Sequence, residues 1–347
     1  IYSILTFVIS TWLVTRIWKL FYKSHGWLPV LFWLTFQVVK WSYANNFQEN
    51  TMTIFCLLAA WSYLQCLVYN RLHWVMSVVA VLMIFAATLC KGPVGLYPLA
   101  IPFLWFVVNG KKSLTPALTT GWVSLLFLGL CYGLLWQIPA AKFALHKFLE
   151  IQLMPSLNGQ LSTGNRFYIL GQLLIQLLPA IGIMLLAAYA RRGKEQPNPA
   201  PMLLFLLIAL SAALPIMVST KQMSIYLVPA MPFFALAAAA YTESSVNELQ
   251  RLPARALTVL FIVCYLGIAA SFVAGVLRIG VTGRDQKIIS SLQQLDAELP
   301  KNTTVTVTPE LWENWALQAY LYRFYFVSVN VHDDNAWYLG PKENVPA

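Results

Sequence analysis

The 347-residue chain is 59% hydrophobic and only 10% charged, and its mean hydropathy is +0.64. This apolar content exceeds what a soluble globular protein buries, so many apolar residues must face lipid. The net charge of +10 is scattered among short loops, which excludes a concentrated nucleic-acid-binding surface. The composition therefore predicts a polytopic membrane protein that binds membrane lipids and no nucleic acid.

Apolar runs that can cross a hydrocarbon core of about 30 Å, which takes roughly 17 to 25 helical residues, follow one another along most of the chain. Each run must be helical, because lipid offers the backbone N–H and C=O groups no partner. We predict ten spanning helices, at approximately 1–18, 27–44, 51–69, 74–90, 94–109, 114–136, 167–190, 201–218, 222–241 and 256–279.

Lys and Arg are concentrated in every second loop, and short loops rich in these residues stay cytoplasmic. The other loops, and the chain after Arg278, are predicted to face outward, into the periplasm of a bacterium. On this topology the chain begins outside, which requires a span upstream, so we expect the sequence to be N-terminally incomplete. The charges that define the cytoplasmic side are Arg16, Lys19, Lys23, Arg71, Lys111, Lys112, Arg191, Arg192, Lys194, Arg251 and Arg255.

The composition changes after the last predicted span, where charged residues, Asn and Thr return. Helical periodicity over 285–299 and 309–322 alternates with strand-like segments over 303–308 and 325–331. After Trp337 the chain reads as a loop-like tail, with no further strand to complete a large sheet. We therefore predict a membrane domain over 1–280 and a small α/β domain over 281–347 on the outer side.

Ionisable residues at the edges of apolar spans are candidates for a functional site, because the membrane makes them costly. Glu49, Lys91, Glu150 and Lys221 are four such residues, and the predicted topology places all of them on the outer surface. Each also has a purely structural interpretation. A carboxylate at position 49 favours the positive end of a helix dipole, the lysines can extend to the headgroups, and Glu150 lies in an amphipathic segment. Both interpretations stay open on the sequence.

Two of these residues lie in longer motifs. Lys91 opens Lys-Gly-Pro-Val-Gly-Leu-Tyr-Pro, and Ser219-Thr-Lys is followed by Tyr226-Leu-Val-Pro. In their order and common side, these motifs resemble the GT-C membrane glycosyltransferases, and most closely the aminoarabinose-transferase and protein O-mannosyltransferase-like group. In that family an Asp usually opens the helix that corresponds to the segment starting at Glu49. The resemblance covers nearly all of the chain.

The resemblance implies transfer of a sugar from a polyprenyl-phosphate carrier to a lipid, glycan or protein acceptor at the outer face of the bacterial inner membrane. Such a reaction would serve lipopolysaccharide or protein glycosylation in the cell envelope. Fixed cations would stabilise the charge that develops on the carrier phosphate, and we expect Lys91, Lys221 and Arg166 to supply them. We expect Tyr226 to donate a hydrogen bond to the same phosphate and Glu49 to act as the catalytic base.

Glu150 and Tyr97 are the candidates for contact with the acceptor. Relatives often carry Glu followed by His in the long outer loop, whereas Ile151 follows Glu150 here. The cysteines show no metal-ligand spacing either, so a divalent metal is unsupported and we predict no cofactor. A transporter or flippase for lipids or sugar-lipids is the main rival, although it would show an internal repeat and charges near the bilayer midplane. A scaffold without chemistry is the third interpretation.

Overall fold

The computed structural model of the protein describes residues 1–70, 73–157, 166–190, 198–219, 222–249, 285–294, 301–331 and 337–340, with isolated positions between 255 and 277. The chain divides into two compact units, Ile1–Leu257 and Thr258–Ala347. The predicted boundary between residues 280 and 281 lies outside the described residues and stays a prediction.

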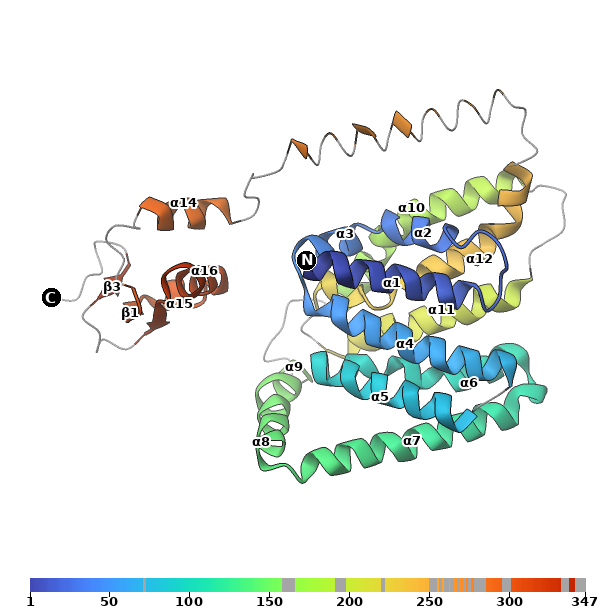
Figure 1. Cartoon of the computed structure of the whole chain (residues 1–347), viewed down its shortest axis with the longest axis horizontal. Coiled ribbons are helices and arrows are strands. Elements are labelled where there is room, and N and C mark those ends of the chain that lie inside the picture. The colour runs from blue at the N-terminus through green and yellow to red at the C-terminus, as the bar shows by residue number, and fades with distance from the viewer. Residues whose placement is uncertain are drawn as a thin grey trace. The chain divides into compact units, whose positions relative to one another are not determined.

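The first unit is a bundle of long helices that lie side by side (Figure 1). Large apolar side chains on its flanks are exposed, as lipid-facing residues must be; Leu126 and Leu186 are examples. Within the described ranges, five helical stretches are long and apolar enough to cross a membrane, and Tyr2–Trp18 is apolar but shorter. The chain is thus a mostly helical, multi-pass membrane protein. The five stretches are Gln48–Tyr69, Trp74–Asn109, Leu114–Trp136, Tyr168–Tyr189 and Pro199–Val218.

The bundle uses the following helices. The first part of the unit contains α1 (Tyr2–Trp18), α2 (Leu28–Thr35), α3 (Gln37–Ala44), α4 (Gln48–Tyr69), α5 (His73–Lys91), η1 (Gly92–Ala100), α6 (Ile101–Asn109) and α7 (Leu114–Trp136). The second part contains α10 (Tyr168–Ala190), α11 (Pro199–Ala213), η4 (Leu214–Val218), η5 (Ser224–Leu227) and α12 (Met231–Leu249). The tenth predicted span, 256–279, lies largely outside the described residues, so the count of ten stays a prediction.

The second predicted span, 27–44, is not one continuous helix, and that prediction was wrong. The chain becomes extended at Phe36, with ψ of 120°, which separates α2 from α3. A break in lipid leaves backbone N–H groups without intrahelical partners. The side chain of Gln176 on α10, which is buried, accepts a hydrogen bond of 2.8 Å from the Val38 N–H at the start of α3. A polar side chain from another span thereby makes the broken helix tolerable.

The fourth and fifth predicted spans are joined by a reversal at Gly92, whose φ is +73°. After it, η1 turns back along α5, and an added Cβ at Gly95 would lie 2.7 Å from the carbonyl carbon of Ala87. Only glycine permits this approach between the two backbones. The reversal places the end of α5 and the start of η1 at the same end of the bundle.

The core of this unit combines large aromatic residues with small ones. Trp18, Trp33, Tyr63 and Phe205 are fully buried. Helix α12 carries a run of alanines over 237–240 and packs between α2 and α11. Small side chains let spanning helices approach closely in a bilayer, where no hydrophobic force drives them together.

A short helical segment lies across one end of the bundle, near the N-terminus (Figure 1). It consists of α8 (Pro139–Phe148), the π-helical turn η3 (Leu149–Leu153) and α9 (Met154–Leu157). The amphipathic segment that carries Glu150 is thus helical. None of the residues of α8 is buried, so the helix is held to the bundle by few side chains.

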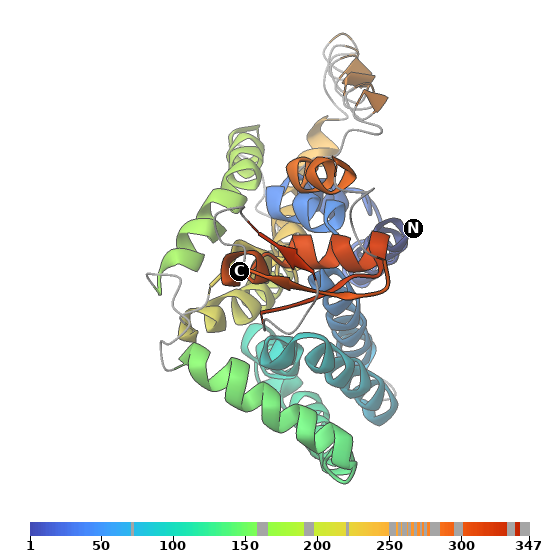
Figure 2. The same cartoon turned by 90° about the vertical axis from the view of Figure 1, so that its left-hand side faces the viewer.

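The second unit contains a three-stranded parallel sheet, whose strands are red in Figure 2. The strand order is β2-β1-β3, and Val305 on β1 is paired with Val329 on β2. Leu292, Leu317 and Leu321 pack against the sheet as a small core of their own. The elements are α14 (Gln286–Gln294), β1 (Thr304–Val307), α15 (Pro309–Trp312), α16 (Trp315–Tyr325), β2 (Ser328–Asn330) and β3 (Tyr338–Leu339).

Two predictions for this unit were wrong. The expected helix over 309–322 is divided, because the side chain of Asn314 accepts a hydrogen bond from the Leu317 N–H and caps the start of α16. The tail that read as a loop contains β3, which is anchored where the Thr306 N–H donates to the Trp337 carbonyl at 2.9 Å. A strand of two residues is too short to show an alternating pattern.

Candidate functional site

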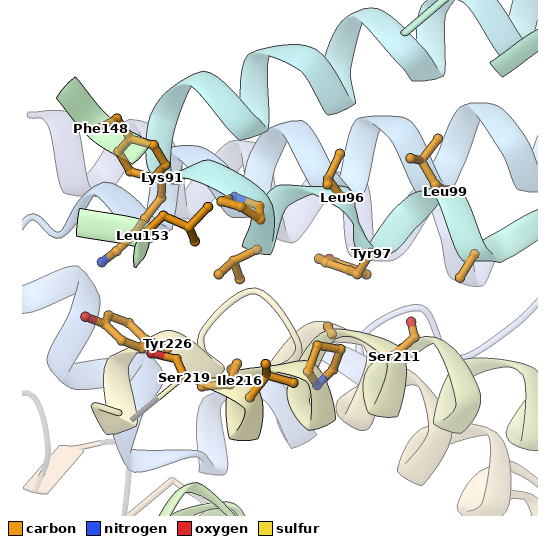
Figure 3. A pocket seen from close by; sticks show the side chains of 16 residues that line it. Lys91, Leu96, Tyr97, Leu99, Phe148, Leu153, Ser211, Ile216, Ser219 and Tyr226 are labelled. Atoms are coloured by element: carbon orange, nitrogen blue, oxygen red, sulfur yellow. The ribbon is translucent and has the colours of Figure 1, made fainter. Parts of the chain in front are cut away.

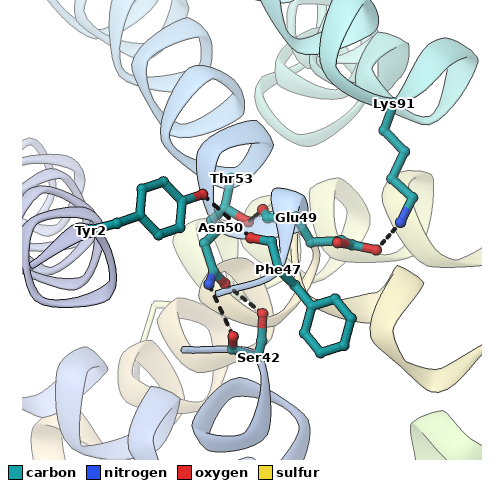
Figure 4. A network of polar contacts seen from close by, with 7 residues as sticks. All are labelled: Tyr2, Ser42, Phe47, Glu49, Asn50, Thr53 and Lys91. Atoms are coloured by element: carbon teal, nitrogen blue, oxygen red, sulfur yellow. Dashed lines mark hydrogen bonds and ion pairs between the residues drawn. The ribbon is translucent and has the colours of Figure 1, made fainter. Parts of the chain in front are cut away.

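The polar centre of the bundle is an ion pair between Glu49 and Lys91 (Figure 4). Glu49 lies in the first turn of α4 and Lys91 is the last residue of α5, so two adjacent helices bring them together. The carboxylate is 1% exposed and the lysine side chain 29% exposed. The Lys91 Nζ donates to the Glu49 Oε1, while the buried Oε2 has no hydrogen-bond partner among the described residues.

A hydrogen-bond network fixes the turn that carries Glu49. The Ser42 hydroxyl donates to the Asn50 Oδ1 at 2.5 Å, and the Asn50 Nδ2 donates to the Ser42 carbonyl at 3.1 Å. The Thr53 hydroxyl donates to the carbonyl of Glu49 at 2.6 Å. Asn50 is fully buried, so both ends of its amide must be satisfied within the protein. The network therefore sets where the start of α4 lies against α3.

Tyr226 on η5 forms the other side of the site. The Lys91 Nζ lies 4.6 Å from the centroid of the Tyr226 ring, within cation–π distance. The Tyr97 hydroxyl donates to the Pro229 carbonyl at 3.0 Å and so ties η1 to the chain just after η5. The ammonium group is thus held between a carboxylate from α4 and a ring from η5.

A cavity of about 700 Å³ extends from Lys91 between η1 and the α11–η4 segment (Figure 3). Tyr226 and Ser219 lie with Lys91 at one end, and Ser211 lies toward the other. The wall between the two ends is mostly apolar. The cavity therefore has one cationic end and a long hydrophobic body, whose side chains include Val94, Leu96, Leu99, Ile216 and Val218.

The segment that crosses the end of the bundle covers the cationic end of this cavity. Phe148 and Leu153 both line it, beside Lys91. A Cβ added to Gly92 would lie 2.6 Å from the Cζ of Phe148, so the ring fits only against glycine. Sequence reasoning missed Phe148 and Leu153. No local pattern marks them, because their contacts join segments far apart in the chain.

The remaining predicted site residues have different surroundings. Lys221 lies outside the described residues. Arg166 is exposed, and its backbone carbonyl accepts a hydrogen bond of 2.8 Å from the Gln222 side chain. Glu150 is also exposed and pairs with His146 one turn earlier, at 3.2 Å.

The structure thus brings three of the predicted residues together, Glu49, Lys91 and Tyr226, and places Tyr97 farther along the same cavity. Tyr97 belongs to the cavity wall, with its hydroxyl bound to the protein backbone. Within the described part of the chain, no group of three or more His, Cys, Asp or Glu side chains is placed to hold a metal ion. The chemistry available at this site is that of a cation beside a carboxylate and a phenol.

No family model matches the chain, and no curated protein matches it. Two solved structures are similar to it, both of ArnT from Cupriavidus metallidurans. The structure bound to undecaprenyl phosphate has a TM-score of 0.43 at 17% identity, and the apo structure has 0.42 at 16%. Each match covers 82% of this chain and 51% of the other, so the chain spans about half the length of these structures. With TM-scores below 0.5, these similarities assign neither a family nor an activity.

Proposed function

We propose that the chain is the membrane part of a glycosyltransferase that moves a sugar from a polyprenyl-phosphate-linked donor to a lipid, glycan or protein acceptor. The observation that carries this proposal is the polarity of the large cavity. Its body is apolar and its one cation, among the residues that line it, is Lys91 at one end. A polyprenyl phosphate has the same polarity, with a hydrocarbon chain that ends in an anion. The Lys-Gly-Pro motif at the cationic end agrees with the resemblance to GT-C enzymes.

The proposed reaction breaks the bond between the sugar's anomeric carbon and a phosphate oxygen, and the acceptor oxygen forms the new bond. Negative charge then accumulates on the departing phosphate, where a fixed cation stabilises it. In the proposal Lys91 has this role and Tyr226 donates a hydrogen bond to the phosphate. Lys221 and Arg166 are proposed as further cations, and Glu150 as an acceptor contact on the outer loop.

The ion pair gives the proposed mechanism an order of events. The Lys91 ammonium is bound to Glu49. An arriving phosphate competes with the carboxylate for this cation and releases the Glu49 Oε1, which can then accept the proton of the acceptor hydroxyl. Oε1 would become available as a base only when the donor is bound.

The membrane arrangement that accompanies this proposal has ten spans in a bacterial inner membrane, with residues 281–347 in the periplasm. In it, the end of the bundle with α8 and the Glu49–Lys91 pair is the outer end. The catalytic site would then open where lipid-linked sugars and their acceptors meet at the membrane surface.

The test uses the full-length protein in vesicles with a radiolabelled polyprenyl-phosphate sugar. We expect label to leave the carrier, and Lys91→Gln to slow this step by about 10² to 10³, the usual effect of removing a group that stabilises transition-state charge. Lys40→Gln is the matched control, since Lys40 is an exposed lysine on α3 outside the cavity.

Transfer at the wild-type rate in Lys91→Gln would contradict the proposed phosphate site. Movement of intact carrier across the bilayer without loss of label would instead identify a flippase. Glu49→Gln separates the two roles: it should retain donor binding and lose transfer.

A further inference from the structure

A second cavity, of about 630 Å³, lies between α1 and α2 at the end of the bundle opposite Glu49 and Lys91. Its position follows from α1, whose first residue Tyr2 contacts Thr51 near Glu49 and whose last turn leads to Lys19. The residues that line it are Thr11, Thr15, Lys19, Gly26, Trp27, Val30, Leu31 and Leu34; we name this cavity the α1–α2 groove.

The sequence explains the shape of the α1–α2 groove. Thr11, Thr15 and Lys19 are four residues apart and so share one face of α1. The Thr15 hydroxyl donates to the Thr11 carbonyl at 2.9 Å, which satisfies it within its own helix. Small side chains on α1 thus face large apolar ones on α2. Trp27 and Leu31 are 54% and 48% exposed, so the groove is open along its apolar side.

The charge at the end of the groove is positive. Lys19 lies in the groove and is exposed, and Arg16 and Lys23 belong to the same end of α1 and its following loop. The acidic side chain described near this loop, Glu243, pairs with His25 at 3.5 Å and is mostly buried. Lys19 therefore has no neutralising partner among the described residues. The positive-inside rule assigns this end to the cytoplasm.

We infer that the α1–α2 groove binds an anionic glycerophospholipid of the cytoplasmic leaflet, with one acyl chain in the groove and the phosphate at Lys19. From Thr11 to Lys19 the helix rises by about 12 Å, close to the half-thickness of about 15 Å of the hydrocarbon core. The cation therefore lies at headgroup depth when the apolar wall is filled by an acyl chain. Basic pockets between helices on this side bind anionic headgroups by such charge attraction. Trp27, which also lines the groove, suits the same interface.

The inference is tested with the full chain in phosphatidylcholine nanodiscs that contain a small fraction of lipid with brominated acyl chains. Bromine quenches nearby tryptophan, and the signal of Trp27 is the difference between the wild type and Trp27→Phe. We expect brominated phosphatidylglycerol to quench Trp27 with about fivefold higher apparent affinity than brominated phosphatidylcholine, the preference that one surface lysine supplies. Lys19→Gln should abolish the preference.

Lys111→Gln is the matched control, because Lys111 is an exposed lysine on the same predicted side that does not line the groove. It should leave the preference unchanged. Equal quenching by both lipids in the wild type would mean that only annular lipid, with no preference for the headgroup, occupies the groove. No quenching by either lipid would mean that protein fills it. Either result overturns the inference, and neither depends on glycosyl transfer.

Discussion

The ring of Phe148 occupies the space that a side chain at position 92 would need. The Phe148 Cζ lies 2.6 Å from where a Cβ on Gly92 would be, and Gly92 has a φ of +73°. We expect Gly92→Ala to expel the ring from the Lys91 end of the cavity. Removing Phe148 should relieve the clash, so Gly92→Ala with Phe148→Ala should be more stable than Gly92→Ala alone. Unfolding of the variants in mixed micelles measures this.

Gly110 provides the control for backbone strain. Its φ is +74°, yet an added Cβ would meet nothing within 4 Å. Gly110→Ala should therefore cost only the backbone strain of its conformation, φ +74° and ψ −162°, a region nearly restricted to glycine, at about 1 to 3 kcal/mol. Equal losses at the two glycines would contradict a specific role for Phe148.

The two partners of the ion pair should respond unequally to mutation. Glu49 is 1% exposed, so Lys91→Met leaves a buried carboxylate without its cation, at a cost of about 3 kcal/mol or more. Glu49→Gln leaves an ammonium group that is 29% exposed and still close to the Tyr226 ring, and should cost less. The free energies of unfolding of the two single variants, each compared with the wild type, measure the difference. The reverse order would show that Lys91 is the more poorly solvated partner.

The hydrogen bonds of Asn50 should matter more than those of a neighbouring asparagine. Asn50→Ala leaves the Ser42 hydroxyl and carbonyl without these partners in a buried place, which costs about 1 to 3 kcal/mol. Asn45→Ala removes one exposed bond to the Trp41 carbonyl and should change little. Thermal unfolding compares the two. A small effect at Asn50 would mean that the turn before α4 does not depend on this network.

The stability of the second unit should depend on pH through Tyr320. Its hydroxyl donates to the Asp285 Oδ2 at 3.1 Å, and burial together with this bond raises the pKa of Tyr320 above its usual 10.0. The folded state therefore favours the neutral phenol. This contribution is complete below about pH 10 and is lost as the pH rises through the raised pKa.

The check for Tyr320 is unfolding at several pH values between neutral and strongly alkaline. Tyr320→Phe should be less stable than the wild type at neutral pH, and the gap should close as the pH rises. Tyr322→Phe, at an exposed position on the same helix, serves as the control. A gap that stays constant with pH would exclude a role for the Tyr320 proton.

The sequence was sufficient for features that depend on composition and local pattern. Hydropathy located the five long apolar stretches that the structure describes, and the cost of charge in a membrane singled out Glu49 and Lys91. The sequence could not reveal the break between α2 and α3 at Phe36. Every residue around that position is apolar or helix-compatible, and the group that makes the break tolerable, Gln176, belongs to a distant helix.

The same reason explains what was missed at the candidate site. The cover formed by Phe148 exists only because Gly92 leaves room for it, and neither residue alone predicts the contact. The strand Tyr338–Leu339 is defined by its pairing with β1 rather than by its own two residues. Short strands, and contacts such as that of the Phe148 ring with Gly92, are fixed by tertiary structure, which local sequence patterns do not contain.

The hydrogen bond between Val38 and Gln176 also has a consequence for biosynthesis. The two residues are 138 positions apart, and at roughly 5 to 20 residues per second the ribosome needs about 7 to 28 s to make the intervening chain. Throughout that interval the first turn of α3 lacks the side chain that completes its hydrogen bonds. Helices α2 and α3 must therefore stay at the translocon, or packed against helices made earlier, until α10 has been synthesised and completes the hydrogen bonds of the span.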